Sequence, residues 1–421
     1  MPSEISPGSV EGGSAATAHL EPILNSSAEQ GRPRQPLKIA VITPTPTPYR
    51  DPFWGEVARR REIELEVLYC AAGTSDRPWA TEWSREMRCS VLPGYNLFHR
   101  LGDSSSCFWN PSVLLRLRQG RFDAVVLGGY NHPTMIAAAL WAKTHRVPYF
   151  LMCESHLRSR RSTWKQWVKA RVVGWFVRNA AGLFPTGQLA ADYLVHYGAD
   201  RANLAAVPNV PDVNQVRDHV SDLRRDKSFP VPPELEGRPI VLFVARLIPK
   251  KRPELLIRAF CDAPAAQDAV LVIAGDGPLR PELEQLVERL GLRSRVHFTG
   301  FLQPAELLGW YACASVFVLP SSETWGVVVI EALSAGVPVI ISDETGSCAD
   351  AINDSAVGTI IPAGDQAALS RALESHLSRP STPEIVHQSW EPVRRQMTYE
   401  AIADRFVSLV GRCCRGGKLS G

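Results

Sequence analysis

The 421-residue sequence lacks a long apolar run, a cysteine framework and a strong excess of either charge. No apolar stretch reaches the roughly 18 residues that a membrane-spanning helix requires. The nine cysteines are scattered, with neither a CxxC pair nor a zinc-type spacing, which favours a reducing compartment over a disulfide-bonded one. The formal net charge of +3 argues against a dedicated nucleic-acid-binding protein, because phosphate recognition needs clustered positive charge.

Residues 1–36 also lack the basic and apolar regions of a secretory signal peptide. Their Ser, Gly, Ala, Pro and Glu content predicts a disordered leader. Together with the cysteine distribution, this favours a cytoplasmic protein.

What is present is a repeated alternation of short apolar runs with helix-patterned segments. Strands are expected from Leu37 (LKIAVITP) and at 63–69, 124–127, 148–153, 182–186, 240–245, 269–274, 296–299, 315–319 and 337–341. Helical patterns at 53–60 and 133–143 separate the first of these runs, and an amphipathic pattern at 399–410 follows the last. Such alternation predicts an α/β protein with two doubly wound parallel sheets, whose ligands bind at the loops after the strands.

The expected boundaries follow from changes in composition along the chain. They are a leader at 1–36, a first Rossmann-like domain at 37–210, a proline-rich charged linker at 211–237, a second Rossmann-like domain at 238–385, a C-terminal helical segment at 386–412 that could cross back to the first domain, and a flexible tail at 413–421.

The stretch SSETWGVVVIEALSAGVPVI contains two acids, Glu323 and Glu331, in otherwise apolar surroundings. Its pattern predicts a strand, a loop carrying Glu323, and a helix from Gly326 that carries Glu331 two turns later. The free N–H groups of the first helical turn attract phosphates, and carboxylates accept hydrogen bonds from vicinal sugar hydroxyls. We therefore expect an anion site flanked by two hydroxyl-binding acids.

Two further loops follow expected strands. In FVARLIPKKRPE, Arg246 and Lys251 could clamp a diphosphate, although a solvated basic turn explains the pattern equally well. In VIAGDGPL, the Gly-Asp-Gly-Pro turn is a weak signal by itself, because Asp-Gly is common in turns.

Taken together, ARLIPKK, AGDGPL, VHFTGFL, ETWGVVVIEALSAGVPVI with its Glu-x7-Glu spacing, and SDETGSCAD resemble the retaining family-4 glycosyltransferases (glycosyl transferases group 1) with the GT-B fold. This resemblance implies two Rossmann-like domains facing a central cleft and a nucleotide diphosphate sugar as co-substrate. Glu331 would bind the ribose and Glu323 the donor sugar, while Arg246 and Lys251 would hold the diphosphate. The other expected donor-binding residues are Phe301 near the base, Trp325, and the amides near Gly326 and Val327.

The resemblance also implies transfer with retention of configuration and without a metal. A departing diphosphate needs a metal or fixed cations and amides. The sequence has no Asp-x-Asp pair, the usual metal-binding pattern of the other main transferase fold, so the Arg246–Lys251 clamp could take that role. We expect no cofactor.

The first domain would then select the acceptor, which could be a sugar, a glycan, a lipid-linked molecule or a small molecule. Pro44, Pro46 and Pro48 deprive the loop TPTPTPYRDPFW of backbone donors, so Tyr49 and Arg50 are the candidate acceptor contacts, although a rigid structural turn explains this loop equally well. Glu154 falls where many family members carry a histidine near the acceptor, and His156 follows two residues later. The sequence leaves open which of the two serves the acceptor.

The segment 157–179 is basic and rich in tryptophan, with Arg158, Arg160, Arg161, Lys165, Lys169, Arg171 and Arg178 among apolar residues at helical spacing. Such a helix can lie in an anionic membrane interface, which would place the protein at the inner face of the cytoplasmic membrane. Alternatively, its apolar stripe packs on the first sheet.

Two other functions remain compatible with these motifs. One is a non-catalytic subunit that binds a nucleotide sugar, and the other is a GT-B nucleotide-sugar epimerase or phosphorylase.

Overall fold

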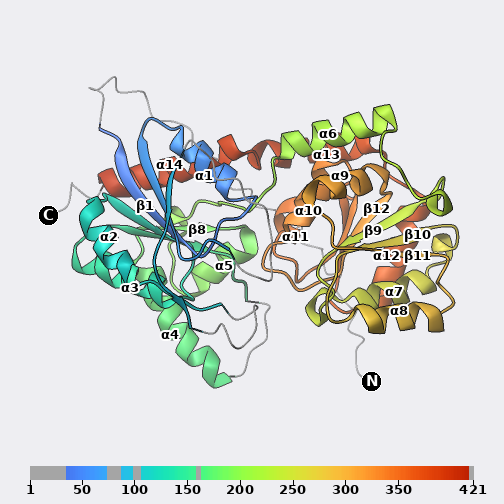
Figure 1. Cartoon of the computed structure of the whole chain (residues 1–421), viewed down its shortest axis with the longest axis horizontal. Coiled ribbons are helices and arrows are strands. Elements are labelled where there is room, and N and C mark those ends of the chain that lie inside the picture. The colour runs from blue at the N-terminus through green and yellow to red at the C-terminus, as the bar shows by residue number, and fades with distance from the viewer. Residues whose placement is uncertain (1–34, 74–86, 98–105, 158–162, 417–421) are drawn as a thin grey trace, which may run out of the picture. The chain divides into compact units, whose positions relative to one another are not determined.

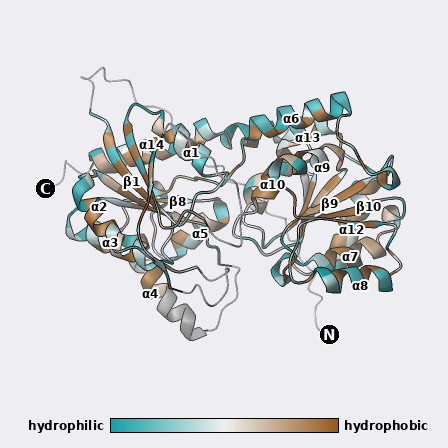
Figure 2. Cartoon of the chain, viewed as in Figure 1, coloured by the Kyte–Doolittle hydropathy of each residue, from teal (hydrophilic) through white to brown (hydrophobic). Residues whose placement is uncertain are grey.

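The computed structural model describes residues 35–73, 87–97, 106–157 and 163–416. Pro36–Gly421 form one compact unit that contains two six-stranded parallel sheets (Figure 1). Most strands are coloured brown in Figure 2, because they are short apolar runs buried on both faces, as is typical of a parallel sheet covered by helices. The predicted pair of doubly wound sheets is therefore confirmed.

The first sheet has the order β3-β2-β1-β6-β7-β8. Its strands are β1 (Leu37–Thr43), β2 (Ile63–Tyr69), β3 (Arg88–Val91), β6 (Ala124–Leu127), β7 (Tyr149–Cys153) and β8 (Gly182–Pro185). The helices of this half are α1 (Asp51–Ala58), α2 (Ser112–Gly120), α3 (Pro133–Thr144), α4 (Thr163–Asn179) and, after the last strand, α5 (Gln188–His196). A two-stranded antiparallel pair, β4 (Tyr95–Asn96) and β5 (Phe108–Trp109), lies outside the sheet.

The second sheet repeats the pattern with the order β11-β10-β9-β12-β13-β14. Its strands are β9 (Ile240–Val244), β10 (Val270–Ala274), β11 (Val296–Gly300), β12 (Val316–Leu319), β13 (Val339–Ser342) and β14 (Gly358–Ile361). Its helices are α7 (Pro253–Asp262), α8 (Arg280–Arg289), α9 (Pro304–Cys313), α10 (Val327–Ser334), α11 (Cys348–Ala351), α12 (Gln366–Ser378) and α13 (Pro383–Gln396). Figure 1 shows α7, α8 and α12 on one face of this sheet and α9 and α10 on the other.

All ten expected strands are present, with ends shifted by one or two residues. The edge strands β3 and β14 are not among the strands expected from the sequence. The sequence of β3 is RCSV and half of it is exposed, while β14 begins with a glycine, so neither forms a continuous apolar run. Short 3-10 turns occupy Arg201–Asn203 (η3), Pro233–Leu235 (η4), Pro249–Lys251 (η5) and Pro264–Ala266 (η6).

The segment expected as a linker contains the helix α6 (Val213–Asp226), whose N-terminus is capped by the Asp212 carboxylate. This helix packs on α9 and α10 of the second sheet. The Arg224 guanidinium donates to the carbonyls of Tyr311, Ala312 and Ala335 at 2.6–3.1 Å. Helix α6 is therefore an ordered part of the second half, not a free linker.

The last helix, α14 (Tyr399–Gly416), packs on α1 and β8 of the first half. Phe406 on α14 is fully buried, and its ring centroid lies 4.7 Å from that of Phe184 and 5.6 Å from that of Trp54. The helix continues to Gly416, past the tail boundary expected at 413, because Cys413 and Cys414 are half-buried against the core.

The predicted leader lies almost entirely outside the described residues. Among the helices that are described, none combines the length and the apolar character that crossing a membrane would take.

Candidate functional site

The loop after β12 places Glu323 beside Lys251, which lies in η5 after β9. The Lys251 ammonium and the Glu323 carboxylate form an ion pair, with only 15% and 12% of their side chains exposed. Ser322 N donates to the Lys250 carbonyl at 3.0 Å, which joins the two loops a second time through the backbone. The structure thus brings together two residues that the sequence predicted in separate motifs.

The loop after β13 holds this arrangement from the other side. Glu323 N donates to the Glu344 carbonyl at 3.2 Å, and Gly346 N donates to the Glu323 carbonyl at 3.0 Å. Gly346 must be small, because a Cβ atom there would lie 1.9 Å from the Thr324 carbonyl oxygen. The Arg252 guanidinium binds the Glu344 carboxylate at 2.7 Å and the Pro320 carbonyl at 3.1 Å. Glu323 therefore stands on a loop fixed by backbone and side-chain bonds.

Helix α10 follows this loop directly. Gly326 has φ of 95°, a left-handed conformation that suits glycine, and Val327 begins the helix. The first N–H groups of an α-helix have no intrahelical acceptor, so those of Gly326 and Val327 belong to an anion-attracting helix start. Gly326 and Val327 follow Glu323 of the ion pair by three and four residues in the same loop.

Glu331 lies on the second turn of α10 and is half-buried. The fully buried Tyr311 on α9 donates its hydroxyl to Glu331 Oε2 at 3.0 Å. Burial raises the pKa of Glu331, and the Tyr311 hydrogen bond opposes part of that rise. The other carboxylate oxygen of Glu331 can still accept from a ligand hydroxyl.

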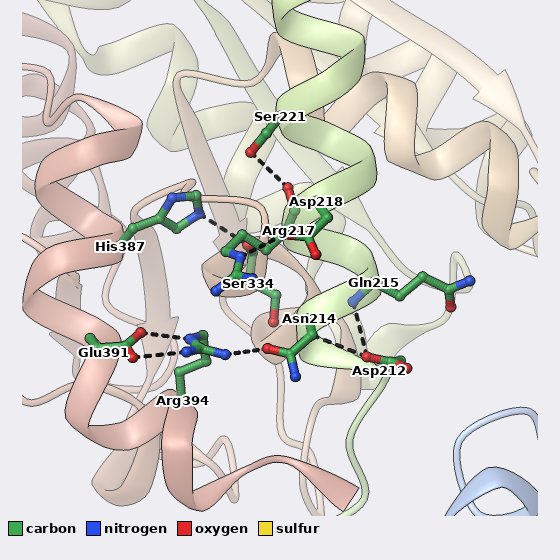
Figure 3. A network of polar contacts seen from close by, with 10 residues as sticks. All are labelled: Asp212, Asn214, Gln215, Arg217, Asp218, Ser221, Ser334, His387, Glu391 and Arg394. Carbon is green, nitrogen blue, oxygen red and sulfur yellow. Dashed lines mark hydrogen bonds and ion pairs between the residues drawn. The ribbon is translucent and has the colours of Figure 1, made fainter.

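The C-terminal end of α10 is fixed by a separate polar network (Figure 3). His387 on α13 bonds the Ser334 carbonyl at 3.1 Å through Nε2. On the same helix, Arg394 binds Glu391 and also the Asn214 side chain on α6. This network connects α13 with α6 and the end of α10, so the helix carrying Glu331 is held at both ends.

The Gly-Asp-Gly turn after β10 supports the loop that carries Arg246. A Cβ atom at Gly275 would lie 1.9 Å from the Ala245 carbonyl oxygen, and one at Gly277 would lie 2.6 Å from that of Leu247. Leu247 N also donates to the Asp276 carbonyl at 2.9 Å. The two glycines therefore allow the loops after β9 and β10 to approach closely. Arg246, in the first of these loops, is exposed. Phe301, after β11, is 54% exposed.

On the first sheet, Arg50 and Glu154 come together although 104 residues separate them. Arg50 precedes α1 and forms an ion pair with Glu154, which follows β7. Arg50 Nε also donates to Asn209 Oδ1 at 2.8 Å, and Asn209 Nδ2 donates to Glu154 Oε1 at 2.9 Å. Asn209, which the sequence reading missed, completes a three-membered polar cluster. Tyr49 is half-buried in the same proline-rich loop as Arg50.

Residues from both sheets meet around this cluster. The His156 ring bonds the Glu323 carbonyl at 3.1 Å, so its Nε2 carries the proton. The Thr324 hydroxyl lies 3.5 Å from Glu154 Oε2, and the indole N–H of Trp325 donates to the Asn209 carbonyl at 2.7 Å. Trp325 is only 3% exposed, so its side chain is buried in this contact with Asn209. The candidate acceptor residues and the Glu323 loop thus occupy one site.

A second contact joins the sheets at the start of α5. The Asp350 carboxylate on α11 accepts from Gln188 N at 3.0 and 3.1 Å. A Cβ atom at Gly187 would lie 2.4 Å from the Trp325 ring and 2.5 Å from the Asp350 carboxylate. Burial raises the pKa of Asp350 to about 6, while the Gln188 bond opposes this shift and Asp192 adds to it.

The basic segment 157–179 is described only in part. Residues 158–162 lie outside the described residues, as do the side chains of 163–169. In the remainder of α4, Val173, Phe176 and Val177 are buried, and Phe176 contacts Tyr149 of β7. This part of the apolar stripe packs on the first sheet, whereas Val172 is 43% exposed.

Within the described parts of the chain, no group of three or more His, Cys, Asp or Glu side chains is arranged to hold a metal ion.

Comparisons with known proteins assign both halves. Residues 39–210 match the model of a glycosyl transferase 4-like domain, and residues 224–391 match the model of glycosyl transferases group 1. The chain belongs to the glycosyltransferase family that these two models describe. The family predicted from the sequence is therefore confirmed.

The individual curated relatives match only part of the chain. The chain is 34% identical over 161 residues to an alpha-D-kanosaminyltransferase of Streptomyces kanamyceticus, covering 38% of this chain and 42% of that protein. It is 33% identical over 232 residues to a D-inositol 3-phosphate glycosyltransferase of Streptomyces scabiei, covering 51% and 50%. The chain thus spans about half the length of the curated relatives it matches.

Structural similarity covers more of the chain than sequence similarity does. The crystal structure of Anabaena Alr3699/HepE in complex with UDP aligns with a TM-score of 0.68 at 18% identity, covering 89% of this chain and all of that chain. The two-domain GT-B fold of this glycosyltransferase chain is therefore confirmed.

Proposed function

We propose that this glycosyltransferase moves a glycosyl group from a nucleoside diphosphate sugar to an acceptor hydroxyl. The observation that carries the proposal is the ion pair between Lys251 and Glu323 beside the start of α10. A cation, a carboxylate and helix amides at one place match the phosphates and hydroxyls of such a donor. The Glu331 carboxylate, one turn further along α10, matches the ribose.

UDP is the first nucleotide to test. Solved structures of Alr3699/HepE contain UDP or UDP-glucose, and that protein shares this fold. In our proposal Arg246 and Lys251 bind the diphosphate, Glu323 faces the donor sugar, and the exposed ring of Phe301 lies near the base. The Glu323–Lys251 ion pair keeps both groups oriented before the donor binds.

The proposed transfer retains configuration and uses no metal. The bond from the anomeric carbon to the diphosphate oxygen breaks, and a bond to the acceptor oxygen forms on the same face. The acceptor proton passes to an oxygen of the leaving phosphate. Arg246, Lys251 and the amides of Gly326 and Val327 stabilise the charge that develops on the diphosphate.

The structure favours different roles for the two acceptor candidates. The Glu154 side chain is 37% exposed, whereas His156 is 6% exposed and bonds the Glu323 carbonyl. We therefore assign Glu154 to the acceptor hydroxyl and His156 to positioning of the donor loop. Tyr49 and Arg50 complete the acceptor side.

Two classes of acceptor are to be compared, polyhydroxylated rings and lipid-linked molecules. The names of two relatives, a D-inositol 3-phosphate glycosyltransferase and a 2-deoxystreptamine glucosyltransferase, point to polyhydroxylated rings. A lipid-linked acceptor is the alternative, with 157–179 contacting an anionic membrane from the cytoplasmic side. Flotation with phosphatidylglycerol vesicles at low salt tests that alternative, and no flotation would exclude it.

The donor proposal is tested by thermal shift with UDP, GDP and ADP, followed by turnover of the matching sugar nucleotides. UDP should raise the melting temperature, and Lys251→Ala should reduce turnover by about tenfold or more, because a charged hydrogen bond is lost. Unchanged turnover in a folded Lys251→Ala variant would contradict the proposed clamp. An epimerised donor without acceptor would instead favour the epimerase, and nucleotide binding without any turnover would favour a non-catalytic subunit.

A further inference from the structure

Asn209 lies between the two halves of the chain, after β8 and η3 and before α6. Its residue is 5% exposed. The segment around it is anchored on both sides, because Val207 N donates to the Pro185 carbonyl at 2.8 Å and the Tyr399 hydroxyl donates to the Val210 carbonyl at 3.2 Å. Asn209 is thus held in place by β8 and by α14.

Three polar groups of this one residue reach three different loops. The side-chain oxygen accepts from Arg50 in the loop after β1, the side-chain nitrogen donates to Glu154 after β7, and the backbone carbonyl accepts from Trp325 after β12. Each of these loops carries a residue that we place in the transfer site. Both polar atoms of this buried side chain therefore have hydrogen-bond partners within the protein.

The contacts require a group at this position that both accepts and donates a hydrogen bond. Arg50 Nε is a donor and Glu154 Oε1 is an acceptor, so the group between them must accept from one and donate to the other. Leucine would do neither, and an ionised aspartate would accept from Arg50 but repel Glu154. A protonated carboxyl, however, can reproduce both hydrogen bonds.

We propose that Asn209 is the positioning residue that aligns the acceptor-side Glu154 with the donor loop at Trp325. This inference rests on the proposed glycosyl transfer. The Asn209 amide fixes the direction of the Glu154 carboxylate, and its backbone carbonyl fixes the loop that carries Glu323. The residue contacts neither substrate, and it acts through the groups that do.

The test uses Asn209→Asp and Asn209→Leu in the full chain. At pH 8 both variants should transfer about tenfold or more slowly than the wild type, because hydrogen bonds to charged groups are lost. As the pH falls toward 5.5, the ratio of Asn209→Asp to wild type should rise severalfold, because a protonated carboxyl restores the missing donor. The ratio for Asn209→Leu should stay low at every pH.

Asn214→Asp provides the matched control. Asn214 also accepts from an arginine, Arg394, through a side-chain oxygen that aspartate retains, and it lies on α6 outside the transfer site, so the network of Figure 3 stays intact. Its ratio to wild type should stay near one and should not change with pH. A pH-dependent ratio in this control would show that a general effect of the new charge is being measured.

A stability experiment separates this inference from the proposed function. Asn209→Asp should lower the melting temperature at pH 8, and adding Glu154→Gln should restore most of it, because the amide and the carboxylate exchange places. This cycle needs no substrate, so it holds even if UDP-glucose is neither bound nor turned over.

Two results would overturn the positioning role. If the melting temperature of Asn209→Asp is the same with and without Glu154→Gln, the two residues do not form the contact. If the stability cycle behaves as expected but both Asn209 variants transfer at the wild-type rate, the contact is structural only. In the second case UDP binding and turnover by the wild type would still support the proposed function.

Discussion

Replacing Asp350 with asparagine should change how the stability of the protein depends on pH. Burial raises the pKa of Asp350 from 3.8 to about 6. Between these values the unfolded chain has lost the proton and the folded chain keeps it, so folding is favoured at low pH and this stability is lost as the pH rises. Asparagine keeps an oxygen that can accept from Gln188 N, but it does not titrate.

The size of the effect follows from the shift. A difference of about two pKa units corresponds to about 3 kcal/mol over the whole window. Only part of this change in stability lies above pH 5, because the unfolded carboxyl ionises mainly below pH 5. Between pH 5 and pH 7.5, the free energy of unfolding of the wild type should fall by about 1.4 kcal/mol relative to Asp350→Asn.

Urea unfolding followed by tryptophan fluorescence at pH 5 and pH 7.5 measures this difference. The eleven tryptophans, of which Trp325 lies against Gly187 at the same contact, report unfolding of the whole chain. The exposed Asp354, four residues further on, supplies the matched control Asp354→Asn. A difference between wild type and Asp350→Asn that does not change with pH, or that changes in the opposite direction, would refute the reasoning.

Two other predictions follow from contacts within the second half. Tyr311→Phe removes the hydroxyl that donates to Glu331, so the pKa of Glu331 should rise further. Calorimetry should show that this variant binds UDP several-fold more weakly than the wild type, with a larger loss at pH 6 than at pH 8. An equal loss of UDP affinity at the two pH values would contradict a ribose role for the Glu331 carboxylate. Gly275→Ala should destabilise the protein by about 2 kcal/mol or more, because the new Cβ would lie 1.9 Å from a carbonyl oxygen. Gly73→Ala, with nothing within 4 Å, should leave the melting temperature almost unchanged, and equal effects of the two variants would contradict the close-approach argument.

The sequence predicted the sheets well because parallel strands covered by helices leave a local signal. Runs such as IVLFV in β9 and VLVIA in β10 are buried on every residue, and their ends are marked by loops with Gly, Pro or charge. Edge strands carry a weaker signal, since fewer of their residues must be apolar. This explains why β3 and β14 were missed.

The site was predictable where one short segment carries the pattern. Glu323, Gly326 and Glu331 lie within nine residues of each other, and their spacing on a loop and a helix is visible in the sequence. The ion pair of Glu323 with Lys251 was not predicted, although both residues were named. Its formation depends on two strands being neighbours in the sheet, which the sequence alone does not state.

Contacts between distant segments left no local signal. Asn209 bonds Arg50 and Trp325 across 159 and 116 residues, and Asp350 bonds Gln188 across 162 residues. A single asparagine in the proline-rich stretch PNVPD looks like an ordinary loop residue. Its importance arises only when three loops meet around it.

The return of α14 to the first sheet has a consequence for the order in which the protein is made. Phe406 packs on the rings of Phe53, Trp54 and Phe184, so the core of the first half includes a residue near the end of the chain. A ribosome synthesises the first half early, but that half cannot close its core until the last helix emerges. A nascent chain stopped after the first sheet therefore exposes this aromatic surface, and completion of the first half is coupled to synthesis of the second.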